Sequence, residues 1–124
     1  MVLKRISLPL TVCKVPVFTP EMLQSEFSFL AHTDEEYSLV CPTAVAPDCT
    51  LAREDGWEAF RIEGVLDFSL IGILASIASV LAEAGISIFA VSTYNTDYVL
   101  VKAERIEAAI AALRSAGYSV EEAV

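Results

Sequence analysis

The chain has 124 residues, of which 55% are hydrophobic and 20% charged, and its formal net charge is −9. This acidity argues against a nucleic-acid partner, because phosphate contacts need clustered Lys and Arg and the eight basic residues here are scattered. The same scatter argues against an anionic membrane surface.

The first half of the chain predicts short and incomplete elements. Ser7 to Val15 alternates like a strand, and Pro9 within it indicates an edge position. Thr19 to Glu21 is a helix start with room for only one or two turns. The other expected elements are a hairpin of Phe27–His32 with Tyr37–Cys41 and a loop from Pro42 to Gly56.

The second half predicts a complete series of elements. Trp57 to Glu63 alternates like a strand. From Ser69 to Ala84 the apolar residues recur at helical spacing, and Gly85 is a typical helix terminator. No charge occurs from Phe68 to Ala82, but these 15 residues are too few to span a bilayer. The remaining expected elements are strands Ile86–Ser92 and Tyr98–Lys102, a helix from Glu104 to Gly117, and a strand Tyr118–Glu122.

This order predicts an α+β fold of the ferredoxin-like β-α-β-β-α-β type. Each helix has one apolar stripe, so both should cover one face of a four-stranded antiparallel sheet. A weak internal repeat relates His32–Val40 to Asn95–Val101 once two residues are gapped. It favours a truncated unit of the same kind at residues 1–56, before the complete unit at residues 57–124.

Two features are candidates for ligand binding. The helix entry around Asp67, Ser69 and Gly72 would present unpaired backbone N–H groups and a positive dipole end, which suit a carboxylate. The polar run Ser92–Asp97 includes Asp97, which could hold an ammonium group. Ordinary helix capping and an ordinary polar hairpin are the alternative interpretations. The two features are expected at opposite ends of their own domain, so that only packing of two domains or two chains would bring them together.

The run from Gly72 through Leu81-Ala82-Glu83-Ala84-Gly85-Ile86 into Ser92-Thr93 resembles the ACT domain, the small regulatory module of amino-acid metabolism. Asp67-Phe68-Ser69 and Thr93 to Val101 resemble the ACT subfamily that also supplies the vertebrate cytosolic arginine sensor. The resemblance covers Trp57 to Val120 well, and Met1 to Gly56 only as a degenerate ACT-like half.

The resemblance implies a non-catalytic domain that binds an amino acid between ACT units. Carried over by residue, Ile71 and Gly72 match the helix-entry backbone contacts, whereas Thr93, Tyr94 and Asp97 match the loop that holds the polar ends of the ligand. No enzyme domain is attached in this sequence, which leaves any regulated partner open. The amino acid itself is also left open, because it depends on pocket shape.

Other functions compete with this one. A structural interaction subunit with a vestigial pocket is the second hypothesis, and a small enzyme using Cys13 or Cys41 with His32 is the third.

The sequence also predicts the location and assembly of the protein. Cys13, Cys41 and Cys49 are odd in number, which fits free thiols in the cytoplasm, and no signal peptide is expected after Met1. One histidine excludes a multi-histidine metal site, and no metal or cofactor is expected. A short apolar chain with a proline-marked edge strand predicts a homodimer.

Overall fold

The computed structural model describes residues 1–63 and 72–122. The chain forms two compact units, in which unit 1 comprises Met1–Ser7 with Glu58–Val124 and unit 2 comprises Leu8–Trp57. Two long strands, β1 (Val2–Val15) and β4 (Ala52–Ile62), contribute residues to both units.

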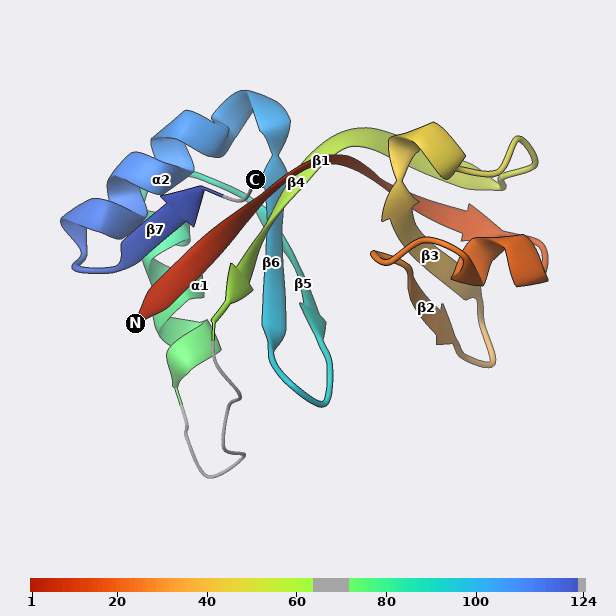
Figure 1. Cartoon of the computed structure of the whole chain (residues 1–124), viewed down its shortest axis with the longest axis horizontal. Coiled ribbons are helices and arrows are strands. Elements are labelled where there is room, and N and C mark those ends of the chain that lie inside the picture. The colour runs from red at the N-terminus through yellow and green to blue at the C-terminus, as the bar shows by residue number, and fades with distance from the viewer. Residues whose placement is uncertain (64–71, 123–124) are drawn as a thin grey trace. The chain divides into compact units, whose positions relative to one another are not determined.

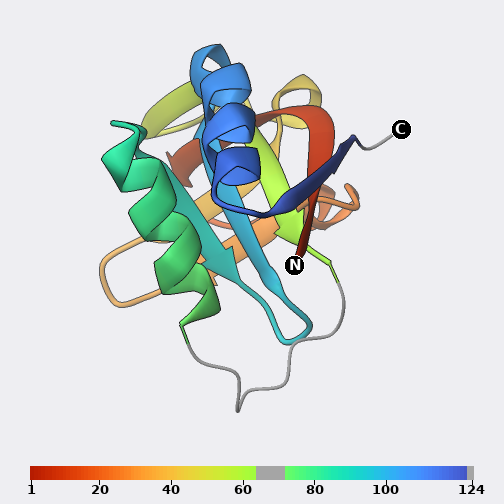
Figure 2. The same ribbon diagram turned by 90° about the vertical axis from the view of Figure 1, so that its left-hand side faces the viewer.

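Unit 1 contains the predicted order of strand, helix, hairpin, helix and strand. Both helices lie on one face of the sheet and contact each other, as Figures 1 and 2 show. The ferredoxin-like α+β fold is therefore confirmed. After β4, its elements are α1 (Ile73–Glu83), β5 (Ile88–Ser92), β6 (Asp97–Lys102), the 3-10 turn η3 (Ala103–Arg105), α2 (Ile106–Ser115) and β7 (Ser119–Glu122).

The core of unit 1 follows from the helical spacing of apolar residues. In α1, Ile77 and Leu81 are one turn apart and fully buried, and in α2 the buried residues also recur at three- and four-residue steps. Burying one such side chain contributes roughly 1.5–3 kcal/mol. The strands supply the other wall of this core through Leu3, Phe60, Ile62, Val99, Val101 and Val120.

Helix α1 begins later than its sequence predicts. Its first residue is Ile73, and Gly72 precedes it as the cap with a φ of 82°, a left-handed conformation that glycine adopts without strain. A Cβ at this position would meet no atom within 4 Å, so the preference for glycine is conformational rather than steric. The prediction that Gly72 lies inside a helix from Ser69 is wrong, since periodicity does not locate a cap. Asp67, Ser69 and Ile71 lie outside the described residues.

An N-terminal strand is inserted in the sheet of unit 1. Residues Val2 to Arg5 of β1 pair in parallel with Ser119 to Glu122 of β7, and β1 also neighbours β4. The strand order in unit 1 is therefore β7-β1-β4-β6-β5. Nothing in the alternation of residues 57–122 predicts this insertion. The two compact units of the structure have different boundaries from the ACT-like units expected at residues 1–56 and 57–124. That expected division remains a prediction.

Pro9 does not mark an edge strand, because β1 lies between two other strands. Pairing of β1 with β7 runs from Val2 to Arg5, and pairing with β3 starts at Leu10. Pro9 lies between these two ladders. Its missing N–H is tolerated there, which explains why the edge prediction was wrong.

Unit 2 has a related hairpin arrangement without α-helices. Its strand order is β2-β3-β1-β4, and 3-10 turns replace both helices. The segment of residues 42–56, expected as a loop with room for a helical turn, contains a 3-10 turn, and the start of β4 within it was not expected. A small cluster of Cys13, Val15, Leu39 and Cys41 forms its core. The further elements are η1 (Pro20–Leu23), β2 (Phe29–His32), β3 (Tyr37–Pro42) and η2 (Thr43–Val45).

The two units repeat with a constant offset. Strands β3 and β6 start at Tyr37 and Asp97, 60 residues apart, and both continue into a 3-10 turn at the same offset. The turns before them also match, because the N–H groups of Thr33 and Thr93 donate to the carbonyls of Glu36 and Thr96 at 3.0 and 2.9 Å. The repeat is therefore ungapped over both hairpins, and the gapped alignment expected from sequence was wrong. Short apolar strands match in several registers, whereas the turn hydrogen bonds fix one.

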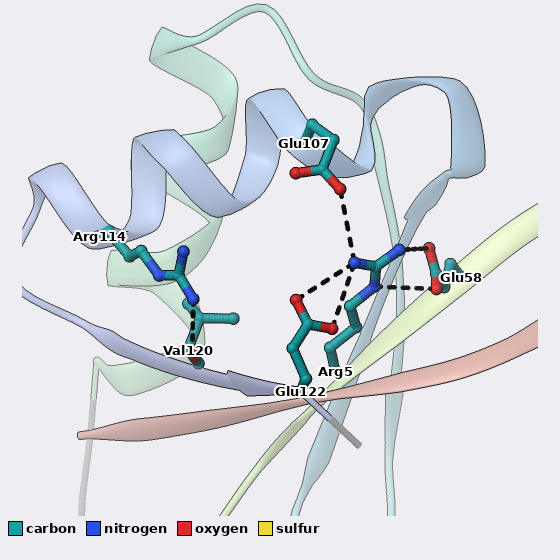
Figure 3. A network of polar contacts seen from close by, with 6 residues as sticks. All are labelled: Arg5, Glu58, Glu107, Arg114, Val120 and Glu122. Carbon is teal, nitrogen blue, oxygen red and sulfur yellow. Dashed lines mark hydrogen bonds and ion pairs between the residues drawn. The ribbon is translucent and has the colours of Figure 1, made fainter. Parts of the chain in front are cut away.

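Arg5 ties the inserted strand to its neighbours in unit 1 (Figure 3). Its guanidinium donates twice to Glu58 of β4, from Nε at 3.0 Å and from Nη2 at 3.4 Å, and Nη1 donates to Glu122 of β7 at 3.2 Å and Glu107 of α2 at 3.5 Å. The hydrogen bond that Arg5 donates to Glu58 raises the pKa of Arg5 above its ordinary value. Only 19% of the Arg5 side chain and 11% of the Glu58 side chain are exposed, so this pair is more than a surface contact.

Replacement of Arg5 should destabilise the protein measurably. Arg5→Ala leaves the buried carboxylate of Glu58 without this partner, which should lower the free energy of unfolding by about 1–3 kcal/mol in urea denaturation. Lys4→Ala is the matched control on the same strand. Lys4 is 36% exposed and its ion pair with Glu63 spans 3.9 Å, so its loss should cost less than about 0.5 kcal/mol. Equal effects of the two substitutions would contradict the assignment.

Candidate functional site

The two features expected to bind a ligand lie at the same end of unit 1. Figures 1 and 2 both show the start of α1 and the β5–β6 hairpin at the end of the unit where β4 finishes. The Thr96 hydroxyl in the hairpin donates to the carbonyl of Ile62, the last residue of β4, at 2.6 Å. The expectation that the two features lie at opposite ends was wrong. Helix α1 leads the chain away from the end of β4, and β5 then runs parallel to β4, so the β5–β6 hairpin returns to that end.

The hairpin is held by its own hydrogen bonds. The Thr93 hydroxyl donates to the Thr96 carbonyl at 2.9 Å and accepts from the Thr96 N–H at 3.3 Å. Thr96 itself is buried, with only 6% exposed. The predicted residue Thr93 therefore already serves the turn, and its role in a site is to hold the loop. Thr96 was not predicted, because a polar run does not reveal which of its hydroxyls folds inward.

Asp97 is the acid of this hairpin. It is half-buried, it opens β6, and it pairs with Ser92 across the ladder. Among the described residues, no hydrogen bond or ion pair to its carboxylate is found. Tyr94 lies at the tip with 81% of its surface exposed. A half-buried carboxylate thus lies beside the end of β4.

The start of α1 provides the complementary charge. The Gly72 carbonyl accepts from the Ser76 N–H at 2.8 Å, while no side chain caps the first turn at Gly72. The first N–H groups of a helix have no partner within the helix and carry a partial positive charge. This end of unit 1 can therefore offer N–H donors and the Asp97 carboxylate to a zwitterion.

The cysteine–histidine enzyme gains no support from unit 2. Cys13 and Cys41 are both buried, and burial raises the pKa of both thiols, that of Cys41 to about 11 with a further contribution from Cys13. These thiols stay protonated at neutral pH, whereas the thiolate is the nucleophilic form. His32 stacks on Tyr37 at a ring separation of 4.1 Å. This environment is that of packed core thiols and an aromatic cluster.

Within residues 1–63 and 72–122, no cluster of three or more His, Cys, Asp or Glu side chains could hold a metal ion. No helix in the same part of the chain is long and apolar enough to cross a membrane.

Unit 1 is a small α+β domain with two helices on one face of its sheet. Its first helix is capped by a glycine and begins beside a polar hairpin. These features define the class of this protein. The family model described as ACT domain matches residues 52–115. The chain belongs to the ACT domain family. No curated protein sequence matches it significantly.

Several solved structures resemble the chain. Protein Atu0741 from Agobacterium tumefaciens is 28% identical with a TM-score of 0.90, over 99% of this chain and 93% of that one. A protein of unknown function from Vibrio cholerae, described as a possible transport protein, is 22% identical with a TM-score of 0.73, over 92% and 88%. The regulatory subunit of aspartate kinase from Thermus thermophilus has 13% identity and a TM-score of 0.62, over 93% and 96%.

The buried thiols should resist alkylation. With iodoacetamide at pH 8, Cys49 should react fully in the folded protein, because it is exposed, while Cys13 and Cys41 should be protected. Raising the pH to 9.5 should not make these two thiols reactive while the chain stays folded, since burial raises the pKa of Cys41 to about 11. Tandem mass spectrometry measures each site, because fragment ions separate Cys41 from Cys49 within their shared tryptic peptide, residues 15–53. Urea-unfolded protein is the control in which all three thiols should react. Rapid labelling of Cys41 in the folded chain would revive a nucleophilic role.

Proposed function

We propose that this protein is a non-catalytic regulatory module that binds a free amino acid at the end of unit 1. Membership of the ACT domain family supports a regulatory, small-molecule-binding role. The observation that carries the proposal is the placement of the start of α1 and the β5–β6 hairpin at one end, with Thr96 bonded to Ile62. The family resemblance predicts this class of ligand, and the local charges suit it.

In this proposal the two charged ends of the ligand go to different elements. The α-carboxylate accepts from the first N–H groups of α1 after Gly72, and the ammonium group donates to Asp97. Thr93 holds the hairpin in place, and Tyr94 supplies a phenol at its tip. Asp67, Ser69 and Ile71 were also predicted for this site, and they lie outside the described residues. We place the protein in the cytoplasm because its three cysteines are free thiols.

An interaction subunit with a vestigial pocket is the second candidate. The observation that favours it is the structural likeness to a regulatory subunit of aspartate kinase, which acts as a separate chain in that system by its description. The two candidates differ in what they predict for ligand binding. A protein partner without any amino-acid response would support the interaction subunit.

An amino acid should stabilise the folded protein. In a thermal-shift screen of the twenty amino acids, one or a few should raise the melting temperature, because a ligand at a hundred times its dissociation constant adds about 2.7 kcal/mol to the free energy of unfolding.

Asp97→Asn should weaken binding of that amino acid about tenfold or more in titration calorimetry, since the ammonium group loses its charged partner. The fold should stay intact, with a change in stability within about 0.5 kcal/mol.

Glu121→Gln is the control for this experiment, because it removes an exposed acid from β7 of the same unit. It should leave the affinity unchanged. If no amino acid raises the melting temperature, the proposal is wrong. If an amino acid binds equally well to Asp97→Asn, the site lies elsewhere.

We also propose that the chain is a homodimer, because ACT units of this size commonly bind ligands where two of them meet. Sedimentation velocity at about 50 µM should give a species of twice the chain mass, as expected for the closed two-fold assemblies that are commonest among soluble oligomers. A monomer at this concentration would contradict the dimer while leaving the binding proposal open to its own test.

A further inference from the structure

Unit 2 contains a pocket of about 330 Å³. It lies where β1 ends and the β2–β3 hairpin turns. Its volume is at the lower end of the range for pockets that bind small molecules, about 300–1,000 Å³. The lining residues are Lys14, Val15, Pro16, His32, Thr33, Asp34, Glu35, Glu36, Tyr37 and Leu51.

The lining of this pocket is negatively charged. Asp34, Glu35 and Glu36 supply three carboxylates, against which Lys14 is the one cation among the lining residues. The backbone that carries the acids is fixed, since the Thr33 N–H donates to the Glu36 carbonyl at 3.0 Å and the Glu35 N–H donates to the Thr33 hydroxyl at 3.1 Å. The acids are thus held together on one turn, where they favour a cation over an anion.

The rest of the pocket is aromatic and apolar. His32 and Tyr37 stack at 4.1 Å with an interplanar angle of 11°, and Phe18 packs edge-on against Tyr37 at 5.1 Å. Leu51 is held beside β1 by a backbone hydrogen bond to the Lys14 carbonyl at 2.7 Å, although 63% of its surface is exposed. Together with the exposed Pro16, these side chains offer an apolar surface to methylene groups, whereas Val15 is buried in the core. The pocket therefore combines carboxylates with carbon contacts.

The equivalent turn in unit 1 has the same backbone and different chemistry. At the offset of 60 residues, Thr33 corresponds to Thr93, and both turns have the same N–H to carbonyl bond. The next three positions carry Asp34, Glu35 and Glu36 in unit 2 and Tyr94-Asn95-Thr96 in unit 1. A turn that needed only to close a hairpin would not require three adjacent acids, which repel one another. This difference in charge gives the two turns different ligand preferences.

We propose that the pocket of unit 2 binds a small aliphatic amine cation, whose ammonium group lies among Asp34, Glu35 and Glu36 and whose carbon chain packs on Pro16 and Leu51. This site is separate from the amino-acid site proposed in unit 1, and its occupancy does not depend on that proposal. The His32–Tyr37 stack forms a preformed wall, so binding requires little reorganisation of the pocket.

The probe for this site is 1,4-diaminobutane, added to the full chain and followed by NMR at fixed pH. His32 is the single histidine of the sequence, so its ring protons give one unambiguous signal inside the pocket. We expect this signal and the amides of residues 33–36 to shift saturably with the diamine. Neutral 1,4-butanediol and sodium chloride at equal ionic strength should not reproduce the shift, because the first lacks the charge and the second lacks the carbon chain.

The double variant Asp34→Asn, Glu36→Gln should weaken diamine binding at least two- to five-fold, the range expected for loss of an exposed charge pair. Glu26→Gln, which removes an exposed acid outside the pocket in the same unit, should leave it unchanged. Shifts that follow ionic strength alone, that 1,4-butanediol reproduces, or that give the same dissociation constant in the double variant would each overturn the proposal. Signals of residues 93–97 report the site in unit 1 separately, so either proposal can fail alone.

Discussion

Unit 1 depends on the pairing of the first residues of the chain with its last strand. Val2 to Arg5 lie beside Ser119 to Glu122 although more than a hundred residues separate them. Closing so long a loop costs conformational entropy, which must be offset by the ladder, by complete burial of Leu3, and by the contacts of Arg5 with Glu58. Without the inserted strand, β7 would lose its partner and β4 one neighbour in the described sheet.

This constraint reaches the candidate site through β4. The inserted strand lies beside β4, and the N–H of Glu63, next after the end of β4, donates to the Val2 carbonyl at 2.9 Å. The end of β4 is therefore held from one side by β1. On the other side, the Ile62 carbonyl accepts from Thr96 and so holds the hairpin. A site at this end of unit 1 rests on scaffold contacts made by residues that touch no ligand.

The two units show how one backbone plan can serve different chemistry. Unit 1 has two full helices over its sheet, whereas unit 2 has only 3-10 turns and a small buried cluster of Cys13, Val15, Leu39 and Cys41. The hairpin turns nevertheless keep the same hydrogen bond. Because turn geometry is set by the backbone and binding preference by the side chains, the positions after Thr33 and Thr93 can diverge without loss of the fold.

Sequence periodicity alone determined which helices and strands follow Trp57 and their order along the chain, because a half-buried element must repeat its apolar residues at its own period. It also located the glycine at position 72 and the polar hairpin with Asp97. Only the tertiary structure decided that β1 enters the sheet beside β7, that Pro9 is interior, that α1 begins at Ile73, and that the helix start and the hairpin share one end. The physical reason is the distance along the chain over which each signal acts. Periodicity reports which face of an element is apolar. Strand partners, the inward turn of Thr96 and the carboxylates around Arg5 are set by contacts between residues far apart in the chain.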